Sequence, residues 1–165
     1  MHEKSIELLN KAVSEELSAV HQYMYFHFHL DDQGYDLLSS MFKRIAIQEM
    51  GHVELLAERI LFLKGEVEMV VAAPVEKIHE VDEMLKKAAW MEETSANDYN
   101  QWANECAAHA DSASKKLFEQ LVLDEEGHFD QFDTQLDQIR KYGDRYLALQ
   151  SIERSKNLES GTVVD

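Results

Sequence analysis

Four long stretches of this chain carry apolar residues at alternating intervals of three and four, and each apolar stripe includes a glutamate. This spacing is typical of amphipathic helices that pack their apolar faces against one another. The chain has only one proline and six glycines, so few residues interrupt helices. We therefore predict an all-α fold whose four main helices span about residues 5–31, 36–64, 82–109 and 112–142.

The links between these helices predict how they are arranged. Residues 31–34 and 111–112 read as short turns, whereas residues 66–81 contain Pro74 and form an extended crossover. A long link joins parallel helices, and a short turn joins antiparallel neighbours. The prediction is an up-down-down-up four-helix bundle with one long crossover.

The end of the chain predicts a smaller element. Gly143 breaks the fourth helix, and apolar residues recur shortly after it. We expect a short fifth helix over about 144–154 and a frayed tail over 155–165, within a single domain of residues 1–165.

The two halves of the chain repeat one acidic pattern. The first helix of each half has a lone glutamate in its stripe, and the second helix has Glu-x-x-His. These residues are Glu16 and Glu49-x-x-His52 in one half, and Glu92 and Glu125-x-x-His128 in the other. The two glutamates are 33 residues apart in each half (49 − 16 and 125 − 92). Residues three apart share a helix face, and a buried carboxylate is costly unless its charge is compensated. The pattern therefore predicts a metal site in the core.

Four carboxylates and two imidazoles suit two first-row metal ions. Glu49 and Glu125 are the candidates to bridge the ions. The terminal ligands would then be Glu16 with His52 on one ion and Glu92 with His128 on the other. Four negative charges balance two Fe²⁺ ions, which can give two electrons to O₂ or peroxide. Cys106 is the only cysteine, so we expect neither a zinc–cysteine site nor an iron–sulfur cluster.

Further polar residues on the first helix have more than one interpretation. Tyr23 lies two turns after Glu16 in the same stripe. It either hydrogen-bonds a ligand or serves as a one-electron donor, or it is a core tyrosine whose hydroxyl is satisfied elsewhere. His21, His27 and His29 are interpreted as residues that pack at an interface or in the core rather than as metal ligands.

Two features near the Glu-x-x-His pattern are given structural interpretations. A third match, Glu76 to His79, lies in the crossover and is interpreted as a solvated loop. Gly51 and Gly127 each precede a motif histidine. A glycine within a helix costs roughly 1 kcal/mol relative to alanine. We interpret both as close packing of helices, although their matched placement also suggests that the site constrains both helices.

The six candidate ligands resemble the di-iron signature of ferritin-like proteins, and the chain is similar to bacterioferritin over nearly its whole length. The sequence is most similar to that family in five segments: Glu16-Leu17-Ser18-Ala19, Gln22-Tyr23, Glu49-Met50-Gly51-His52, Glu58-Arg59-Ile60-Leu61-Phe62-Leu63 and Asp124-Glu125-Glu126-Gly127-His128. The resemblance implies a ferroxidase that oxidises Fe²⁺ with O₂ or H₂O₂ at a di-iron centre within each subunit. It also implies storage of ferric mineral in a hollow homo-oligomeric shell. Twenty-four subunits are favoured by the fifth helix, with twelve as the alternative, and a ferredoxin-type reductant would release iron.

Met50 matches the haem ligand of that family, in which methionines from two subunits hold one haem iron across the dimer twofold. One residue is about 100° around a helix, so Met50 faces away from the core face of Glu49. A thioether can ligate haem iron. The alternative is a methionine packed at a subunit interface.

The chain also departs from the family's pattern. Some bacterioferritins have an auxiliary iron site with a histidine and an aspartate where this chain has Arg44 and Gln48. A tryptophan of some members is replaced by Gln131. The resemblance therefore does not extend to that auxiliary site.

Composition excludes several other classes. The formal net charge of −16 repels nucleic acid and attracts cations. We see no apolar run long enough to span a membrane and no signal peptide, and we expect a cytoplasmic protein. The competing interpretations are a rubrerythrin-like peroxide reductase, a DNA-protecting mini-ferritin and a bundle with an idle metal site. The absence of a cysteine-rich segment opposes the first, and the absence of a basic tail opposes the second.

Overall fold

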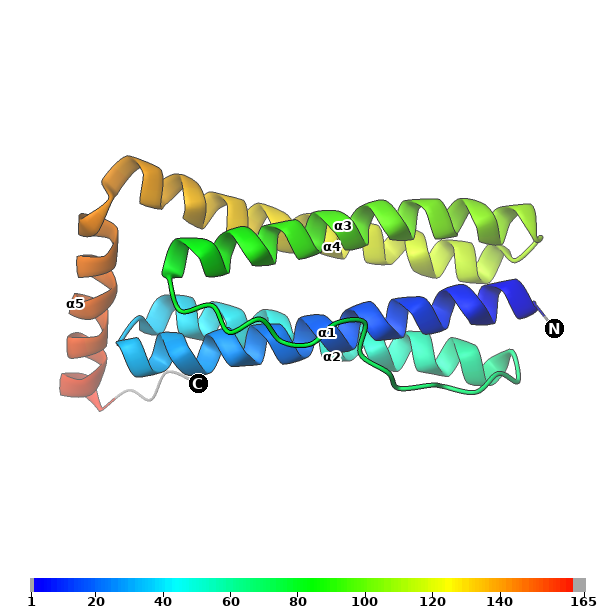
Figure 1. Ribbon diagram of the computed structural model, residues 1–165, viewed down its shortest axis with the longest axis horizontal. Helices are drawn as coiled ribbons and strands as arrows, with labels where there is room; N and C mark the ends of the chain where they lie inside the picture. The colour runs from blue at the N-terminus through cyan, green and yellow to red at the C-terminus, as the bar shows by residue number, and fades with distance from the viewer. Residues whose placement is uncertain (1, 162–165) are drawn as a thin grey trace.

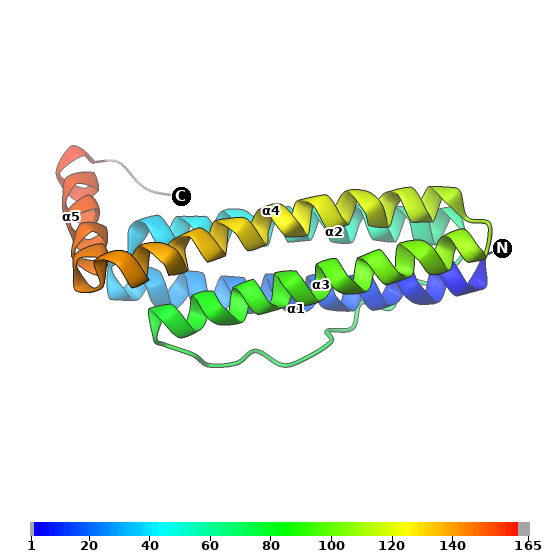
Figure 2. The same cartoon turned by 90° about the horizontal axis from the view of Figure 1, so that it is seen from above.

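The computed structural model describes residues 2–161 and confirms the all-α prediction (Figures 1 and 2). The described residues form five helices: α1 (Glu3–Gln33), α2 (Asp36–Phe62), α3 (Val81–Ala108), α4 (Ser112–Tyr142) and α5 (Asp144–Ser160). Helices α1 and α2 form one hairpin, α3 and α4 form the other, and the hairpins pack side by side. Because the crossover returns along the bundle, α2 and α3 run in the same direction, which gives the predicted up-down-down-up order.

Helix α5 is longer than predicted. It crosses the end of the bundle and continues to Ser160, so the expectation of a frayed tail from residue 155 is wrong for residues 155–160. The prediction ended the helix where the apolar pattern ends. A surface helix can continue past that point, because its exposed residues need not be apolar. Gln150 accepts a hydrogen bond from the backbone N–H of Leu38 (3.2 Å), and Arg154 pairs with Asp36 (3.2 Å). Residues 162–165 lie outside the described part, and the single domain over 1–165 stays a prediction.

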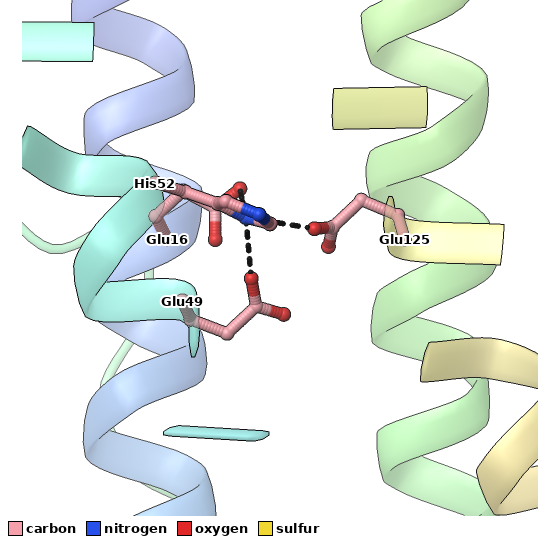
Figure 3. Close-up of side chains that lie close together, drawn as sticks. All are labelled: Glu16, Glu49, His52 and Glu125. Atoms are coloured by element: carbon pink, nitrogen blue, oxygen red, sulfur yellow. Dashed lines mark hydrogen bonds and ion pairs between the residues drawn. The ribbon is translucent and has the colours of Figure 1, made fainter. Parts of the chain in front are cut away.

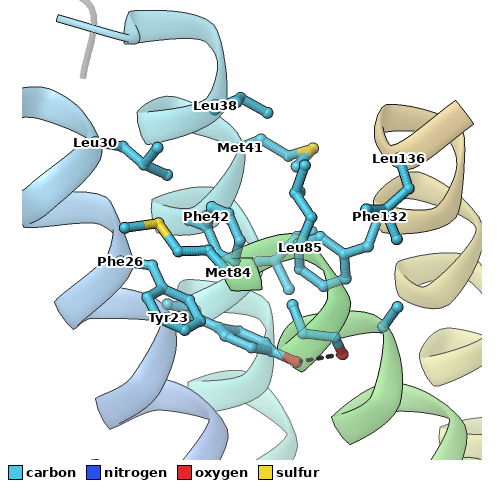
Figure 4. Close-up of a cluster of buried hydrophobic side chains, with 14 of the residues drawn as sticks. Tyr23, Phe26, Leu30, Leu38, Met41, Phe42, Met84, Leu85, Phe132 and Leu136 are labelled. Carbon is cyan, nitrogen blue, oxygen red and sulfur yellow. Dashed lines mark hydrogen bonds between the residues drawn. The ribbon is translucent and has the colours of Figure 1, made fainter. Parts of the chain in front are cut away.

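The apolar core consists of two clusters. One lies toward α5 and is rich in aromatic rings: Tyr23, Phe42 and Phe132 pack with centroids 5.0–5.7 Å apart (Figure 4). The other lies toward the opposite end, around Leu56 and Phe118. Most predicted stripe residues are buried, whereas four are only partly buried: Ile6, Val20, His27 and Ile139. The four stripe glutamates separate the two clusters.

The crossover, residues 63–80, is tied to α1 by side chains. Asn10, Ser18 and Gln22 each bond backbone groups of this extended segment, which has no neighbouring strand to satisfy them. Gln22 holds both the carbonyl (2.9 Å) and the N–H (2.8 Å) of Glu76. None of the described helices is long and apolar enough to cross a membrane.

We expect Gln22→Ala to lower the free energy of unfolding by about 2 kcal/mol, because Gln22 is buried and its loss leaves two backbone groups of Glu76 without partners. Thermal denaturation followed by circular dichroism measures the change. Gln33→Ala is the control, since Gln33 makes one exposed bond to the carbonyl of His79. Equal effects of the two substitutions would contradict the role given to Gln22.

Candidate metal centre

The four stripe glutamates converge in the middle of the bundle, one from each main helix. Glu16, Glu49, Glu92 and Glu125 are at most 2% exposed. The helical spacing of Glu-x-x-His brings the two histidines to the same level, where they are 6% and 5% exposed. Figure 3 shows Glu16 and Glu49 with His52 on one side and Glu125 reaching toward them from α4. The structure therefore brings together all six candidate ligands.

The six side chains form two overlapping groups. One contains Glu16, Glu49, His52 and Glu125; the other contains Glu49, Glu92, Glu125 and His128. Within each group, one potential ligand atom per residue lies within 4.8 Å of the others. The shared members are Glu49 and Glu125, the residues that the sequence suggested as bridges. This is the geometry that two neighbouring metal ions require.

Each imidazole faces more acceptors than it can satisfy. His52 Nδ1 lies 2.8 Å from Glu49 Oε2, 3.0 Å from Glu125 Oε1 and 3.3 Å from Glu16 Oε1. One N–H proton cannot serve three oxygens. In the described part of the chain, one oxygen of each of the four glutamates is buried without a hydrogen bond, although some lie within ion-pair distance of an imidazole. Buried polar atoms are normally bonded, so these oxygens are suited to a metal.

Burial and crowding alter the acidity of the site. Burial, followed by the charge of Glu125, raises the pKa of Glu16. Burial and the charge of Glu49 raise the pKa of Glu92 to about 7. Burial opposes the charged form of His128, but hydrogen bonds with Glu49 and Glu92 outweigh it and raise its pKa to about 11. Without metal, protons therefore balance part of the negative charge.

Glu16 and Glu92 each belong to only one of the two groups, and each accepts a hydrogen bond from a tyrosine. Tyr23 donates to Glu92 Oε1 at 2.8 Å, as one interpretation of the sequence expected. Tyr99 donates to Glu16 Oε1 at 2.7 Å, and sequence reasoning missed this residue. The repeat contained the signal, because Tyr99 follows Glu92 by the same interval that separates Tyr23 from Glu16. Both bonds cross between the hairpins.

The outer nitrogens of the histidines have different partners. His52 Nε2 lies 3.1 Å from Asp124 Oδ2, and His128 Nε2 lies 2.8 Å from Gln48 Oε1. These contacts form the floor of an open pocket of about 620 Å³ between α2 and α4. Asp124 belongs to the motif Asp124-Glu125-Glu126-Gly127-His128, but nothing in that motif predicts its contact with a histidine of another helix.

The expectation of close helix packing at Gly51 and Gly127 is wrong. A Cβ atom at either position would have no neighbour within 4 Å. Both glycines line the pocket above the histidines, on helix faces that no other described element covers. Side chains here would narrow the approach to the site.

The remaining candidates lie away from the centre. Met50 is 54% exposed on α2, as expected for a residue turned off the core. Glu76 pairs with Lys87, and His79 bonds Tyr25, so the third Glu-x-x-His has surface partners. Arg44 donates a hydrogen bond to Gln131 (3.0 Å), so two of the residues that differ from the family pattern contact each other.

The two histidines that are only partly buried on α1 make packing contacts. His27 bonds Ser39, and His29 stacks on His79. His21 is exposed.

Residues 6–142 match the model of the ferritin-like domain family. Among curated proteins, the chain is 37% identical to the bacterioferritin of Desulfovibrio desulfuricans over 88% of this chain and 81% of the relative. It is 36% identical to that of Brucella melitensis over 86% and 88% of the two chains. The chain belongs to the bacterioferritin family. An X-ray structure of the Desulfovibrio desulfuricans bacterioferritin, described as showing its diiron site in different catalytic states, aligns with a TM-score of 0.88 and 36% identity. The alignment covers 90% of this chain and 86% of that one.

We expect the metal-free protein to lose stability as pH rises from 6 to 8. The folded pKa values of Glu92 (about 7) and His128 (about 11) lie above the ordinary values of 4.5 and 6.5, so the folded state binds more protons. The stabilisation is fully present below the ordinary values and disappears as pH passes the folded ones. The two groups together account for roughly 3 kcal/mol over this range.

Denaturation of the metal-free protein at several pH values tests this expectation. Glu92→Gln should flatten the dependence, because it removes one of the two groups. A metal-free protein that becomes more stable between pH 6 and 8 would contradict the proton balance.

We expect Gly51→Ala and Gly127→Ala each to raise the free energy of unfolding by up to about 1 kcal/mol, because alanine favours the helix and meets no neighbour. The thermal midpoint reports the change. Gly65→Ala is the contrasting control: its Cβ would lie 2.7 Å from Ile6 Cγ2, so it should destabilise. A loss of stability in all three variants would show that the pocket faces are packed.

Proposed function

We propose that the chain is an iron-storage ferroxidase of bacterioferritin type. Glu16, Glu49, His52, Glu92, Glu125 and His128 bind two iron ions as substrate and catalytic centre. The observation that carries the proposal is the pair of overlapping ligand groups, buried and sharing Glu49 and Glu125, with one carboxylate oxygen of each glutamate lacking a hydrogen bond.

Charge and redox stoichiometry both fit ferrous iron. Four carboxylates neutralise two Fe²⁺ ions, so the dry core need not hold an uncompensated charge. Each Fe²⁺ gives one electron to O₂, which takes up two protons and leaves as H₂O₂. With peroxide as oxidant, the same two electrons and two protons yield two water molecules.

The side chains around the metal positions favour the binding of iron and its oxidation. Binding of metal displaces the Nδ1 protons of His52 and His128, because the same nitrogen atoms face the carboxylates. Tyr23 and Tyr99 fix Glu92 and Glu16 through hydrogen bonds. The apolar clusters on either side exclude water from the bundle core, which strengthens each electrostatic interaction.

Delivery of iron follows from the surface. A net charge of −16 raises the local concentration of Fe²⁺. The pocket lined by Gly51, Gly127 and the two histidines is the direct approach from outside the bundle, since only the Gln48 and Asp124 contacts separate it from the ligands.

The assembly and the second cofactor are proposed from the family. The exposed thioether of Met50 suits axial ligation of a haem shared by two subunits across a twofold axis. A cytoplasmic shell of twenty-four subunits stores the ferric mineral, with twelve as the alternative, and α5 offers its outer face to neighbouring subunits. A ferredoxin-type protein is the proposed reductant for iron release.

Aerobic addition of Fe²⁺ to the purified protein should produce ferric absorbance rapidly, followed by a mineral core. We expect the rate to fall to that of uncatalysed oxidation in a Glu16→Ala, Glu92→Ala double variant, because each ion loses a terminal carboxylate. Stopped-flow absorbance measures the rate, and electron microscopy shows the core.

Glu126→Ala is the control for that experiment, since Glu126 is exposed and follows a proposed ligand. It should oxidise iron at the unaltered rate. Unaltered oxidation in the double variant would exclude this centre as the ferroxidase. Rapid peroxide consumption without a mineral core would favour the peroxide reductase instead.

A further inference from the structure

The two halves of the chain differ in the residue that contacts Nε2 of each histidine. Gln48 and Asp124 occupy corresponding positions, each one residue before the glutamate of a Glu-x-x-His. Each reaches across to the histidine of the other hairpin: Asp124 to His52 Nε2 (3.1 Å) and Gln48 to His128 Nε2 (2.8 Å). One histidine therefore has a carboxylate behind it, and the other has a neutral amide.

This difference bears on metal binding through the imidazole ring. Nδ1 of each histidine faces the glutamates. When Nδ1 binds a metal, only Nε2 can carry a hydrogen, and the outer partner then accepts it. A carboxylate accepts this hydrogen more strongly than an amide oxygen and pushes electron density onto the ring. The ring with the carboxylate is the better electron donor to a metal at Nδ1.

The two positions have ligands of the same types and corresponding tyrosine bonds. Each has one glutamate of its own, Glu16 or Glu92, and shares Glu49 and Glu125 with its neighbour. Each unshared glutamate accepts a tyrosine hydrogen bond of nearly equal length, 2.7 and 2.8 Å. The positions also differ in that His128 lies farther from its glutamates than His52 does, and in that Glu15 precedes Glu16 where Met91 precedes Glu92. The outer partner is the difference that acts directly on a ligating histidine.

We propose that Asp124 and Gln48 are positioning residues that make the two metal positions unequal, so that the Glu16–His52 position binds a divalent ion more tightly than the Glu92–His128 position. The proposal rests on the proposed di-iron function. It implies an order of loading: the first ion occupies the Glu16–His52 position, and the second completes the pair. At low Fe²⁺ the centre then holds one ion and lacks the second electron that reduction of O₂ to peroxide needs.

Titration of the metal-free, assembled protein with Co²⁺ tests the proposal, because the visible absorption of cobalt reports coordination without turnover. We expect two ions per subunit, with dissociation constants about 10- to 100-fold apart. Glu92→Ala leaves the Glu16–His52 position to be measured alone, and Glu16→Ala leaves the other. The tighter constant should belong to the Glu92→Ala protein.

Isosteric exchanges then test the outer partners. In the Glu92→Ala background, Asp124→Asn should weaken Co²⁺ binding about 10- to 100-fold. In the Glu16→Ala background, Gln48→Glu should strengthen it by a similar factor, a gain that a merely structural role would not produce.

Matched controls separate the hydrogen bond from simple charge. Glu126→Gln removes a charge from α4 without touching a histidine, and Gln131→Glu adds one in the same pocket. Both should change affinity by less than about twofold, because the charge at position 126 is exposed and screened, and a carboxylate at position 131 lies beside Arg44. Equal effects of Asp124→Asn and Glu126→Gln, or of Gln48→Glu and Gln131→Glu, would overturn the inference.

The number of Co²⁺ ions that the unmodified protein binds, and their affinities, distinguish failure of the inequality from failure of the proposed function. Two ions bound with equal affinity would overturn the inequality and leave the proposed function standing. Fewer than two ions per subunit would overturn the di-iron assignment itself, and the inference with it.

Discussion

Four carboxylates meet within one dry layer of this bundle, and much of the structure is arranged to make that tolerable. Mutual repulsion and loss of water both oppose ionisation there. In the metal-free protein, protons reduce the charge: Glu92 has its pKa raised to about 7, and His128 keeps its proton up to a pKa of about 11. Metal ions and protons therefore compete for the same carboxylate and imidazole atoms, and metal binding releases the protons that neutralise the metal-free site.

The internal repeat explains how a single chain builds this layer. Each hairpin supplies one unshared glutamate and one Glu-x-x-His, and each supplies the tyrosine that bonds the unshared glutamate of the other hairpin. These crossed bonds connect the hairpins at the level of the acids. The apolar clusters above and below keep the layer dry. Correct docking of the hairpins and assembly of the site are thus the same event.

One departure from the repeat lies at the outer edge of the layer, beside the histidines. The ligands and tyrosines are the same residue types in both halves, whereas the corresponding positions 48 and 124 hold a glutamine and an aspartate. The pocket beside them is kept open by Gly51 and Gly127, whose missing side chains cost helix stability without relieving any contact. The two halves therefore match at the metal ligands and differ at the pocket, where the outer nitrogen of each histidine contacts its partner.

The sequence alone was sufficient for the helices, the bundle order and the six clustered residues. Helical periodicity is a local property, and an acid recurring in an apolar stripe marks a buried site without any knowledge of distant contacts. The repeat also pointed to Tyr99, although sequence reasoning overlooked it. The extent of α5 escaped prediction because polar surface helices carry no periodic apolar signal.

The remaining features depended on how the helices pack. The open space at Gly51 and Gly127 reflects which faces of α2 and α4 are left uncovered, and glycine has the same appearance in a sequence whether it relieves a contact or leaves a gap. The pairing of Asp124 with His52 joins residues 72 positions apart on different helices. Only the tertiary structure decided these partners, because helix rotation and separation determine which side chains meet across a bundle.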